Sequence, residues 1–211
     1  MKLRAERDYV AALGEPLVAA RPLRPDTLRL VCELLLSCWY GAGRKLLPLV
    51  SAKQGEGRSR LAARLALAFA ALGVRTLLVD GDLRSPAQHH AFGLKNHQGL
   101  ADFLDGRGVQ FTACRENLAV LVAGRASADP LALLAEPRLG RLLDAAARRF
   151  GVVLIDTPAA ARGPDLQIFA ALAGGALVVA RHGAADPRAL RKLRRTLAPA
   201  RARVVGLLLD G

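Results

Sequence analysis

The most informative segment of this sequence spans residues 49–59 and reads Leu49-Val50-Ser51-Ala52-Lys53-Gln54-Gly55-Glu56-Gly57-Arg58-Ser59. An apolar run leads into a glycine-rich turn, and the amphipathic stretch that follows predicts a helix beginning where the turn ends. Turns of this kind place successive backbone N–H groups around a concavity that fits a phosphate. Against the general pattern GxxxxGK(S/T), Ala52 stands at the first glycine, Arg58 at the lysine and Ser59 at the hydroxyl. The segment therefore predicts a phosphate-binding loop.

The loop is expected to bind phosphate along its whole length, through Ala52, Lys53, Gln54, Gly55, Glu56, Gly57, Arg58 and Ser59. The glycines permit backbone angles and a close approach that other residues do not. Arg58 keeps the positive charge of lysine, but its planar guanidinium is bulkier, so the exchange is not conservative where space is tight. Lys53 precedes Arg58 by five residues and either compensates for the missing lysine or is an exposed loop residue.

Short Val- and Leu-rich runs alternate with amphipathic stretches along the chain. Strands are expected at 46–50, 75–80, 118–123, 152–156, 176–180 and 204–209, and helices at 26–40, 59–72, 131–150, 165–172 and 186–197. Asp26 is expected to cap the first helix. This alternation is typical of βαβ units, so the sequence predicts an α/β fold with a doubly wound, mostly parallel sheet flanked by helices. Residues 26–211 are expected to form this domain, and residues 1–25 an arm or leader.

Three aspartates follow apolar strands. Asp80 and Asp82 lie in the segment LLVDGDLR, and Asp156 lies in VVLIDTP. Carboxylates at the carboxyl ends of parallel strands face the crevice where ligands bind in such sheets. A Mg²⁺ ion on phosphate oxygens needs one or two carboxylates, and a nucleophilic hydroxyl needs a base. Aspartate is also a common turn residue, which explains any one of these positions better than all three.

The composition is that of a folded, strongly basic chain. Hydrophobic residues make up 52%, and 31 Lys and Arg against 18 Asp and Glu give a net charge of +13. Such a charge favours anionic partners, although a compositional bias toward Arg explains it equally well. No apolar run approaches the roughly 20 residues that span a bilayer. The start, MKLRAERDYV, lacks the apolar core of a signal peptide, so a cytoplasmic chain is expected.

The loop and the two aspartate motifs, in this order, resemble those of the bacterial tyrosine kinases of polysaccharide synthesis and export. These are P-loop relatives of the partition and cell-division ATPases of the MinD/ParA type. The segment 84–104 resembles the kinases rather than the partition ATPases, and the resemblance covers residues 26–211. A branch linked to exosortase-associated exopolysaccharide loci is similar in its GEGRS loop.

The resemblance implies ATP and Mg²⁺ as cofactors. Residues 52–59 would hold the phosphates, Ser59 and Asp82 would serve Mg²⁺, and Asp156 would act on the metal through water. Asp80 would be the base for a tyrosine hydroxyl, although the division of roles between Asp80 and Asp82 stays open; Arg58 would assist them. The resemblance also implies a membrane co-polymerase or chain-length partner, a homo-oligomer and a peripheral position at the inner membrane face, but not nucleic acid.

The sequence departs from the family in three ways. Arg58 replaces the loop lysine, and the ring-forming motif E-x-x-R-x-x-R aligns with Asp26, Arg29 and Cys32. The family's C-terminal tyrosine cluster has no counterpart, since the two tyrosines are Tyr9, a candidate phosphate acceptor, and Tyr40, expected to be packed.

Three functions remain open. The first is a tyrosine-autokinase-like regulator of exopolysaccharide or capsule chain length or export, and the second is a nucleotide-gated scaffold of the same machinery that transfers no phosphate. The third is a positioning ATPase of the partition type, for which Lys53 is the best feature. The basic region 181–203, with Asp186 as its one acid, is either a surface for an anionic membrane or partner tail, or a solvated helix face.

Overall fold

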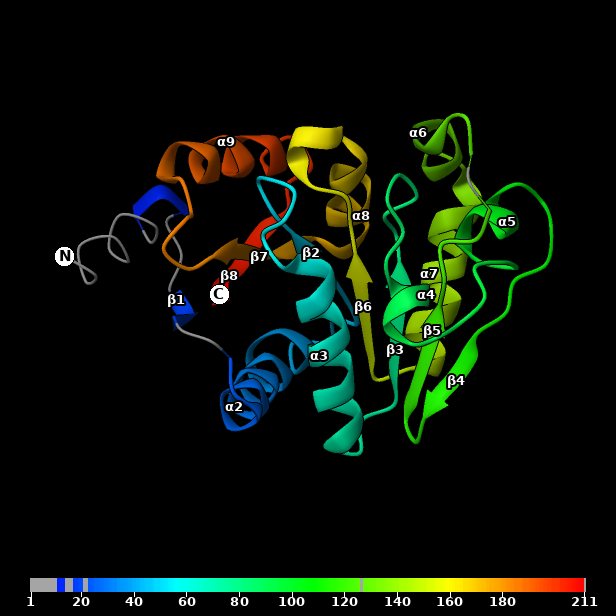
Figure 1. The fold of residues 1–211 in the computed structure, drawn as a ribbon, viewed down its shortest axis with the longest axis horizontal. Coiled ribbons are helices and arrows are strands. Elements are labelled where there is room, and N and C mark those ends of the chain that lie inside the picture. Colours follow the sequence, from blue (N-terminus) through cyan, green and yellow to red (C-terminus); the bar gives the residue numbers. More distant parts are fainter. Residues whose placement is uncertain (1–10, 14–16, 21–22, 126, 211) are drawn as a thin grey trace.

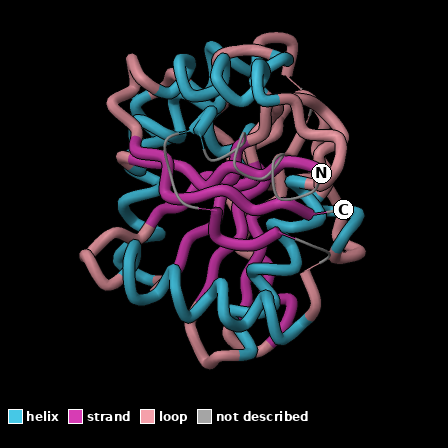
Figure 2. Tube along the Cα trace, turned by 90° about the vertical axis from the view of Figure 1, so that its left-hand side faces the viewer, coloured by secondary structure: helices cyan, strands magenta, loops and turns pink. Residues whose placement is uncertain are grey.

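An eight-stranded sheet runs through the centre of the molecule, and helices cover both of its faces (Figures 1 and 2). The computed structural model describes residues 11–13, 17–20, 23–125 and 127–210. Across the sheet the strands follow the order β1-β8-β7-β2-β6-β3-β5-β4. Their bounds are Leu17–Ala20 for β1, Leu46–Val50 for β2, Thr76–Asp80 for β3, Thr112–Arg115 for β4, Leu118–Leu121 for β5, Val152–Asp156 for β6, Gly175–Arg181 for β7 and Arg203–Asp210 for β8.

Neighbouring strands run parallel except for β4 and β5, which are antiparallel. This confirms the predicted α/β class with a doubly wound, mostly parallel sheet. Strands β2 and β6 have the predicted bounds, and the other expected strands begin or end within two residues of prediction. The two edge strands, β1 and β4, were not predicted. Strand β1 lies within the first 25 residues and pairs with β8, so part of this segment joins the sheet.

The helices follow the chain between the strands. Their bounds are Pro25–Leu35 for α2, Arg58–Ala71 for α3, Gln88–Ala91 for α4, Leu100–Leu104 for α5, Pro130–Leu134 for α6, Pro137–Arg149 for α7, Asp165–Ala173 for α8 and Pro187–Leu197 for α9; a π-helical turn spans Leu36–Tyr40 and a 3-10 turn spans Ala160–Arg162.

Side chains alternate between the two faces of the central strands. On one face, Leu47, Leu78 and Leu154 pack against α2 and α3. On the other face, residues such as Leu77 and Val153 pack against α5 to α8. A third cluster fills the space between β7, β8, α8 and α9. Because the strands are apolar on both faces, the sheet is buried on both sides, as the unbroken Val- and Leu-rich runs predicted.

Two expected helices differ from the structure. Pro137 starts a new helix, so the segment 131–150 is divided into α6 and α7. The helix predicted at 26–40 begins one residue earlier, and its last turn widens into the π-helical turn. Asp26 lies in the first turn of α2 and does not cap it, because Arg24 takes the capping position and Pro25 the first helical one.

The widened turn buries Trp39 and Tyr40. Tyr40 meets Phe69 of α3 edge to face, with ring centroids 5.6 Å apart, so the prediction that Tyr40 is packed is confirmed. Tyr9 lies outside the described residues. Within the described ranges, no helix combines the length and the apolar character needed to cross a bilayer.

The sheet brings the predicted site residues together at the carboxyl ends of its central strands. Strand β6 lies between β2 and β3, with Leu49 beside Asp156 and Asp156 beside Asp80 in the parallel register. The turn that joins β2 to α3, drawn in cyan in Figure 1, leaves the sheet at the same carboxyl end of the strands. Parallel pairing thus positions the glycine-rich loop next to the aspartates.

Candidate functional site

The glycine-rich loop is braced from within. Gly55 and Gly57 have φ angles of +81° and +82°, a region that other residues rarely adopt, and Gly57 stands at the start of α3. Glu56 turns back and accepts a hydrogen bond from the Lys53 backbone N–H at 2.8 Å. The Ser51 hydroxyl donates to the Lys53 carbonyl at 3.1 Å. The loop is therefore held in shape by its own residues.

Asp80 organises the turn that follows β3. One of its carboxylate oxygens accepts the backbone N–H groups of Ala87 at 3.0 Å and Gln88 at 2.9 Å, and the other accepts that of Asp82 at 3.3 Å. The side chain is fully buried. Burial first, and then the nearby negative charge of Asp156, raise the pKa of Asp80 to about 8.

Asp82 and Asp156 each present one carboxylate oxygen to Arg58. Asp82 uses Oδ1 to accept the backbone N–H groups of Arg84 and Ser85, which leaves Oδ2 for a side chain. Asp156 has no solvent exposure. Burial raises the pKa of Asp82, partly offset by the Ser85 hydrogen bond and the charge of Arg58.

Arg58 fills the space between these two acids. Its Nε donates to Asp156 Oδ1 at 3.0 Å, one terminal nitrogen donates to Asp82 Oδ2 at 3.2 Å, and the other donates to the Ser51 hydroxyl at 2.7 Å. The Arg58 side chain is 8% exposed. The residue at the loop's lysine position is thus engaged by the acids at the strand ends.

Gln88, which the sequence analysis did not select, completes this cluster. Its side-chain amide donates to Asp156 Oδ2 at 2.8 Å and to the Ser59 carbonyl at 3.0 Å. Both contacts are acceptors, which fixes the orientation of the amide. The other end of the amide, Oε1, is buried without a hydrogen-bond partner. Gln88 joins the ends of β6 and β3 to the start of α3, and since its contact with Asp156 spans 68 positions, no local sequence signal reveals it.

A pocket of about 360 Å³ opens beside the loop. It is lined by residues 54–60 together with Asp82, Ser85, Ala87 and Arg181. Arg162 ties the two sides together by donating to Gln54 at 3.2 Å and to Ser85 at 3.3 Å. Asp82 lines this pocket and Asp80 does not.

Lys53 lies apart from the pocket lining. Its ammonium pairs with Asp186, the capping residue of α9, at 3.5 Å, and both side chains are exposed. The contact links the loop to the start of α9, and exposed pairs of this kind contribute little to stability.

The pocket suits a phosphate group. The loop supplies backbone N–H groups at the start of the 14-residue helix α3, and Arg181 adds positive charge to the lining. Arg60 also lines the pocket, but its guanidinium pairs with Asp210 at 3.1 Å. The oxygens of Ser59, Asp82 and Asp156 are of the kind that Mg²⁺ prefers. However, Arg58 holds the facing oxygens of Asp82 and Asp156, and within the described part of the chain no three His, Cys, Asp or Glu side chains are grouped to hold a metal. The acids do not fit a metal while Arg58 lies between them.

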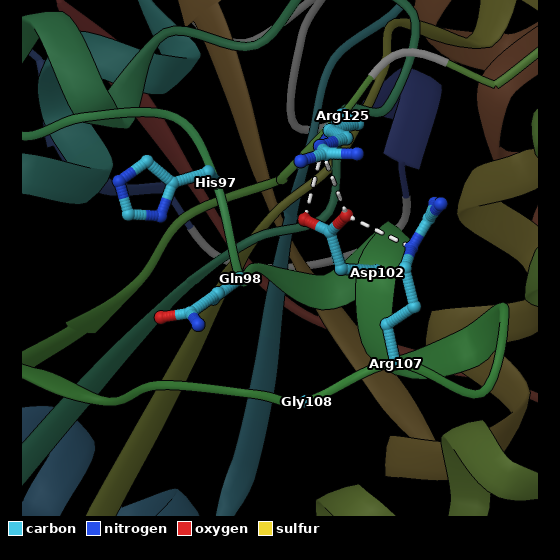
Figure 3. A pocket seen from close by; sticks show the side chains of 6 residues that line it. All are labelled: His97, Gln98, Asp102, Arg107, Gly108 and Arg125. Carbon is cyan, nitrogen blue, oxygen red and sulfur yellow. Dashed lines mark hydrogen bonds and ion pairs between the residues drawn. The ribbon is translucent and has the colours of Figure 1, made fainter.

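A second pocket, of about 390 Å³, lies around Asp102 (Figure 3). Asp102 is 3% exposed and accepts the backbone N–H of Gly99 at 3.0 Å. Arg107 and Arg125 both pair with its carboxylate, at 3.3 and 3.9 Å, and Arg107 also pairs with Asp105. These charges already compensate one another, so we interpret the cluster as a brace for the loops around α5.

Comparison with known proteins identifies the family. No protein-family model matches the chain. The tyrosine-protein kinase YwqD of Bacillus subtilis is 32% identical over 171 residues, which cover 79% of this chain and 72% of YwqD. The putative tyrosine-protein kinase EpsB of Ralstonia nicotianae is 33% identical over 204 residues, 93% of this chain but 27% of EpsB. The succinoglycan biosynthesis transport protein ExoP of Rhizobium meliloti is 33% identical over 86% of this chain and 24% of its own length.

Solved structures of similar fold support the same relationship. The chimeric protein CapA2B2 superposes with a TM-score of 0.89 at 25% identity, covering 97% of this chain and 98% of that one. MinD from Pyrococcus horikoshii, complexed with Mg-ADP, superposes with a TM-score of 0.63 at 24% identity over 78% of this chain and 69% of its own, and shares the fold. The fold is that of the P-loop nucleotide-binding proteins. Within that class, the chain belongs to the family of bacterial tyrosine-protein kinases, as the resemblance predicted.

Proposed function

We propose that this protein is an ATP-binding, tyrosine-autokinase-like regulator of exopolysaccharide or capsule chain length or export. It acts with a membrane co-polymerase at the inner face of the cytoplasmic membrane. The observation that carries the proposal is the glycine-rich loop opening helix α3 beside the carboxylate of Asp82, in one pocket. The names of YwqD and EpsB support kinase chemistry, and that of ExoP supports a role in polysaccharide transport.

In this proposal the loop binds the phosphates of ATP through the backbone N–H groups of residues 54–59, which line the pocket, whereas the Lys53 N–H donates to Glu56. Arg181 in the pocket lining attracts the charged tail of the nucleotide. Asp82 is the carboxylate best placed to meet a tyrosine hydroxyl, because it lines the pocket and Asp80 does not. Ser59, Asp82 and Asp156 carry oxygens of the kind that Mg²⁺ prefers, but Arg58 donates to both acids, so these acids are not available to the ion in this arrangement.

A matched pair of glycines tests the nucleotide site. Gly55 and Gly43 both have a φ of +81°, and a Cβ at either position would have no neighbour within 4 Å. Alanine therefore imposes a similar backbone strain at each, but only Gly55 shapes the loop. By titration calorimetry we expect Gly55→Ala to weaken ATP binding at least tenfold, and Gly43→Ala to leave it within twofold of the wild type. Equal affinity in the two variants would move the nucleotide away from the loop.

The second candidate, a nucleotide-gated scaffold, is favoured by the three-point attachment of Arg58 to Ser51, Asp82 and Asp156. A guanidinium held there is not free to follow the transferred phosphate. Mass spectrometry for phosphotyrosine in protein produced with its membrane partner separates the two functions. Phosphotyrosine that disappears in Asp82→Asn supports the kinase, and its absence in the wild type supports the scaffold.

Helix α9 offers a surface for the membrane or for an acidic partner tail. Its apolar side, formed by Leu190, Leu193 and Leu197, is buried. The exposed side carries the basic residues Arg188, Arg191, Lys192, Arg194 and Arg195. Because Lys53 pairs with the capping residue of α9, the loop and this surface are joined by one contact.

Residues 1–25 are proposed as an arm of the nucleotide-binding domain at 26–211.

A further inference from the structure

The position of Arg58 is set by three buried acceptors from three parts of the chain. Ser51 lies in the loop itself, Asp82 follows β3, and Asp156 ends β6. The acid side chains are 8% and 0% exposed, so both contacts are shielded from water. Since charged hydrogen bonds strengthen when water is excluded, the guanidinium is firmly held at this point.

The guanidinium uses the same oxygens that a metal would need. Mg²⁺ binds carboxylate oxygens at about 2.0 to 2.1 Å. The oxygens that face each other, Asp82 Oδ2 and Asp156 Oδ1, each have an Arg58 nitrogen within 3.2 Å. A metal bound to either oxygen would lie against a permanently positive group, and like charges at such a distance repel strongly. Arg58 and a divalent cation therefore exclude each other here.

Arg58 meets the three acceptors with three separate nitrogens. Its planar fork presents separate nitrogens in different directions, whereas lysine ends in a single nitrogen. Gln88 completes the arrangement, since its amide donates to Asp156 Oδ2 while Arg58 donates to Oδ1. Asp156 thus has a side-chain donor on each oxygen.

We infer that Arg58 is the resident counter-ion of Asp82 and Asp156 in place of a divalent metal, so that nucleotide phosphates bind to the loop without needing Mg²⁺. The second half of the inference rests on the proposed ATP site, whereas the first half concerns the protein without nucleotide. The two halves are tested separately.

The first test is Mn²⁺ binding without nucleotide, followed by electron paramagnetic resonance of the free ion. We expect Arg58→Ala to bind Mn²⁺ at least tenfold more tightly than the wild type, because the acids lose their bridging cation. Arg58→Lys keeps a positive charge but offers one nitrogen in place of three, so its Mn²⁺ affinity should lie between those of the wild type and Arg58→Ala. The matched control is Arg84→Ala, which frees the buried Asp165 from an ion pair at 3.1 Å but exposes no facing pair of acids. It should bind Mn²⁺ like the wild type. Equal Mn²⁺ affinity in the wild type and both Arg58 variants would overturn the inference.

The second test uses the wild type alone, so it does not depend on the folding of a variant. ATP affinity is measured by calorimetry with Mg²⁺ and with EDTA. We expect the two affinities to agree within twofold, and an affinity at least tenfold higher with Mg²⁺ would overturn metal-independent binding. Failure to bind ATP in either condition would refute the proposed function instead, while the Mn²⁺ measurement would still decide the role of Arg58.

Discussion

The buried carboxyl of Asp80 makes a specific prediction for stability against pH. Burial beside Asp156 raises its pKa from 3.8 to about 8, so the folded protein retains a proton that the unfolded chain has lost at neutral pH. A group whose pKa is raised by folding stabilises the folded state less as pH rises. The loss begins near the unfolded pKa and is complete only above the folded value, so the window runs from about pH 4 to about pH 8.

The size of the effect follows from one proton. One bound proton contributes about 1.4 kcal/mol per pH unit while the folded state holds it and the unfolded state does not. From pH 5 to pH 8, Asp80 alone should therefore lower the free energy of unfolding by about 4 kcal/mol. Asn has no such proton and keeps one oxygen for the backbone N–H groups of Ala87 and Gln88. Asp80→Asn should remove this part of the pH dependence.

Urea unfolding at pH 5, 6, 7 and 8 measures the effect as a difference between the wild type and Asp80→Asn. Taking the difference cancels titrating groups that do not interact with Asp80, such as Glu56, whose pKa burial also raises. Asp105→Asn is the control, because that side chain is 54% exposed and should leave the slope unchanged. Parallel pH profiles for the wild type and Asp80→Asn would refute the reasoning, and so would a wild type that gains stability relative to the variant as pH rises.

Two further predictions concern packing. Phe69→Ala should lower the free energy of unfolding by about 3 to 5 kcal/mol, because Phe69 is fully buried and packs edge to face against Tyr40. Chemical denaturation measures this loss, and a loss below about 1 kcal/mol would contradict the packing. Gly99→Ala should lower the free energy of unfolding by about 1 to 3 kcal/mol or more, since a Cβ there would lie 2.3 Å from backbone atoms of Val122 and Gly124. The control is the same change at Gly108, where a Cβ meets nothing within 4 Å. Equal stability of the two variants would exclude the close approach of the backbone at Gly99.

The elements predicted from the sequence are those with a strong local pattern. Strands β2 and β6 are continuous apolar runs, and their ends agree with prediction. Strand β4 was missed because it is a four-residue antiparallel edge strand in which half-buried and exposed residues alternate. The break at Pro137 was missed because apolar spacing continues across it, although Pro is favoured at the first position of a helix and could have marked the boundary.

The sequence selected residues that the structure brings together, but it did not reveal the contacts between them. The glycine-rich loop and the aspartates were found from the pattern of strand ends, and parallel pairing brings them together. The orientation of Arg58 depends on acids 24 and 98 positions away, so no periodicity or spacing reveals it. For the same reason Gln88 was not selected, although it contacts Asp156 directly.

Binding of a nucleotide at the glycine-rich loop is tested by backbone amide chemical shifts, followed by NMR during titration with ATP. We expect the largest shift changes on residues 54–60 and on Ser85, around the pocket beside the loop, with little change around Asp102. Shift changes concentrated around Asp102, Arg107 and Arg125, or none at the loop at saturating ATP, would contradict it.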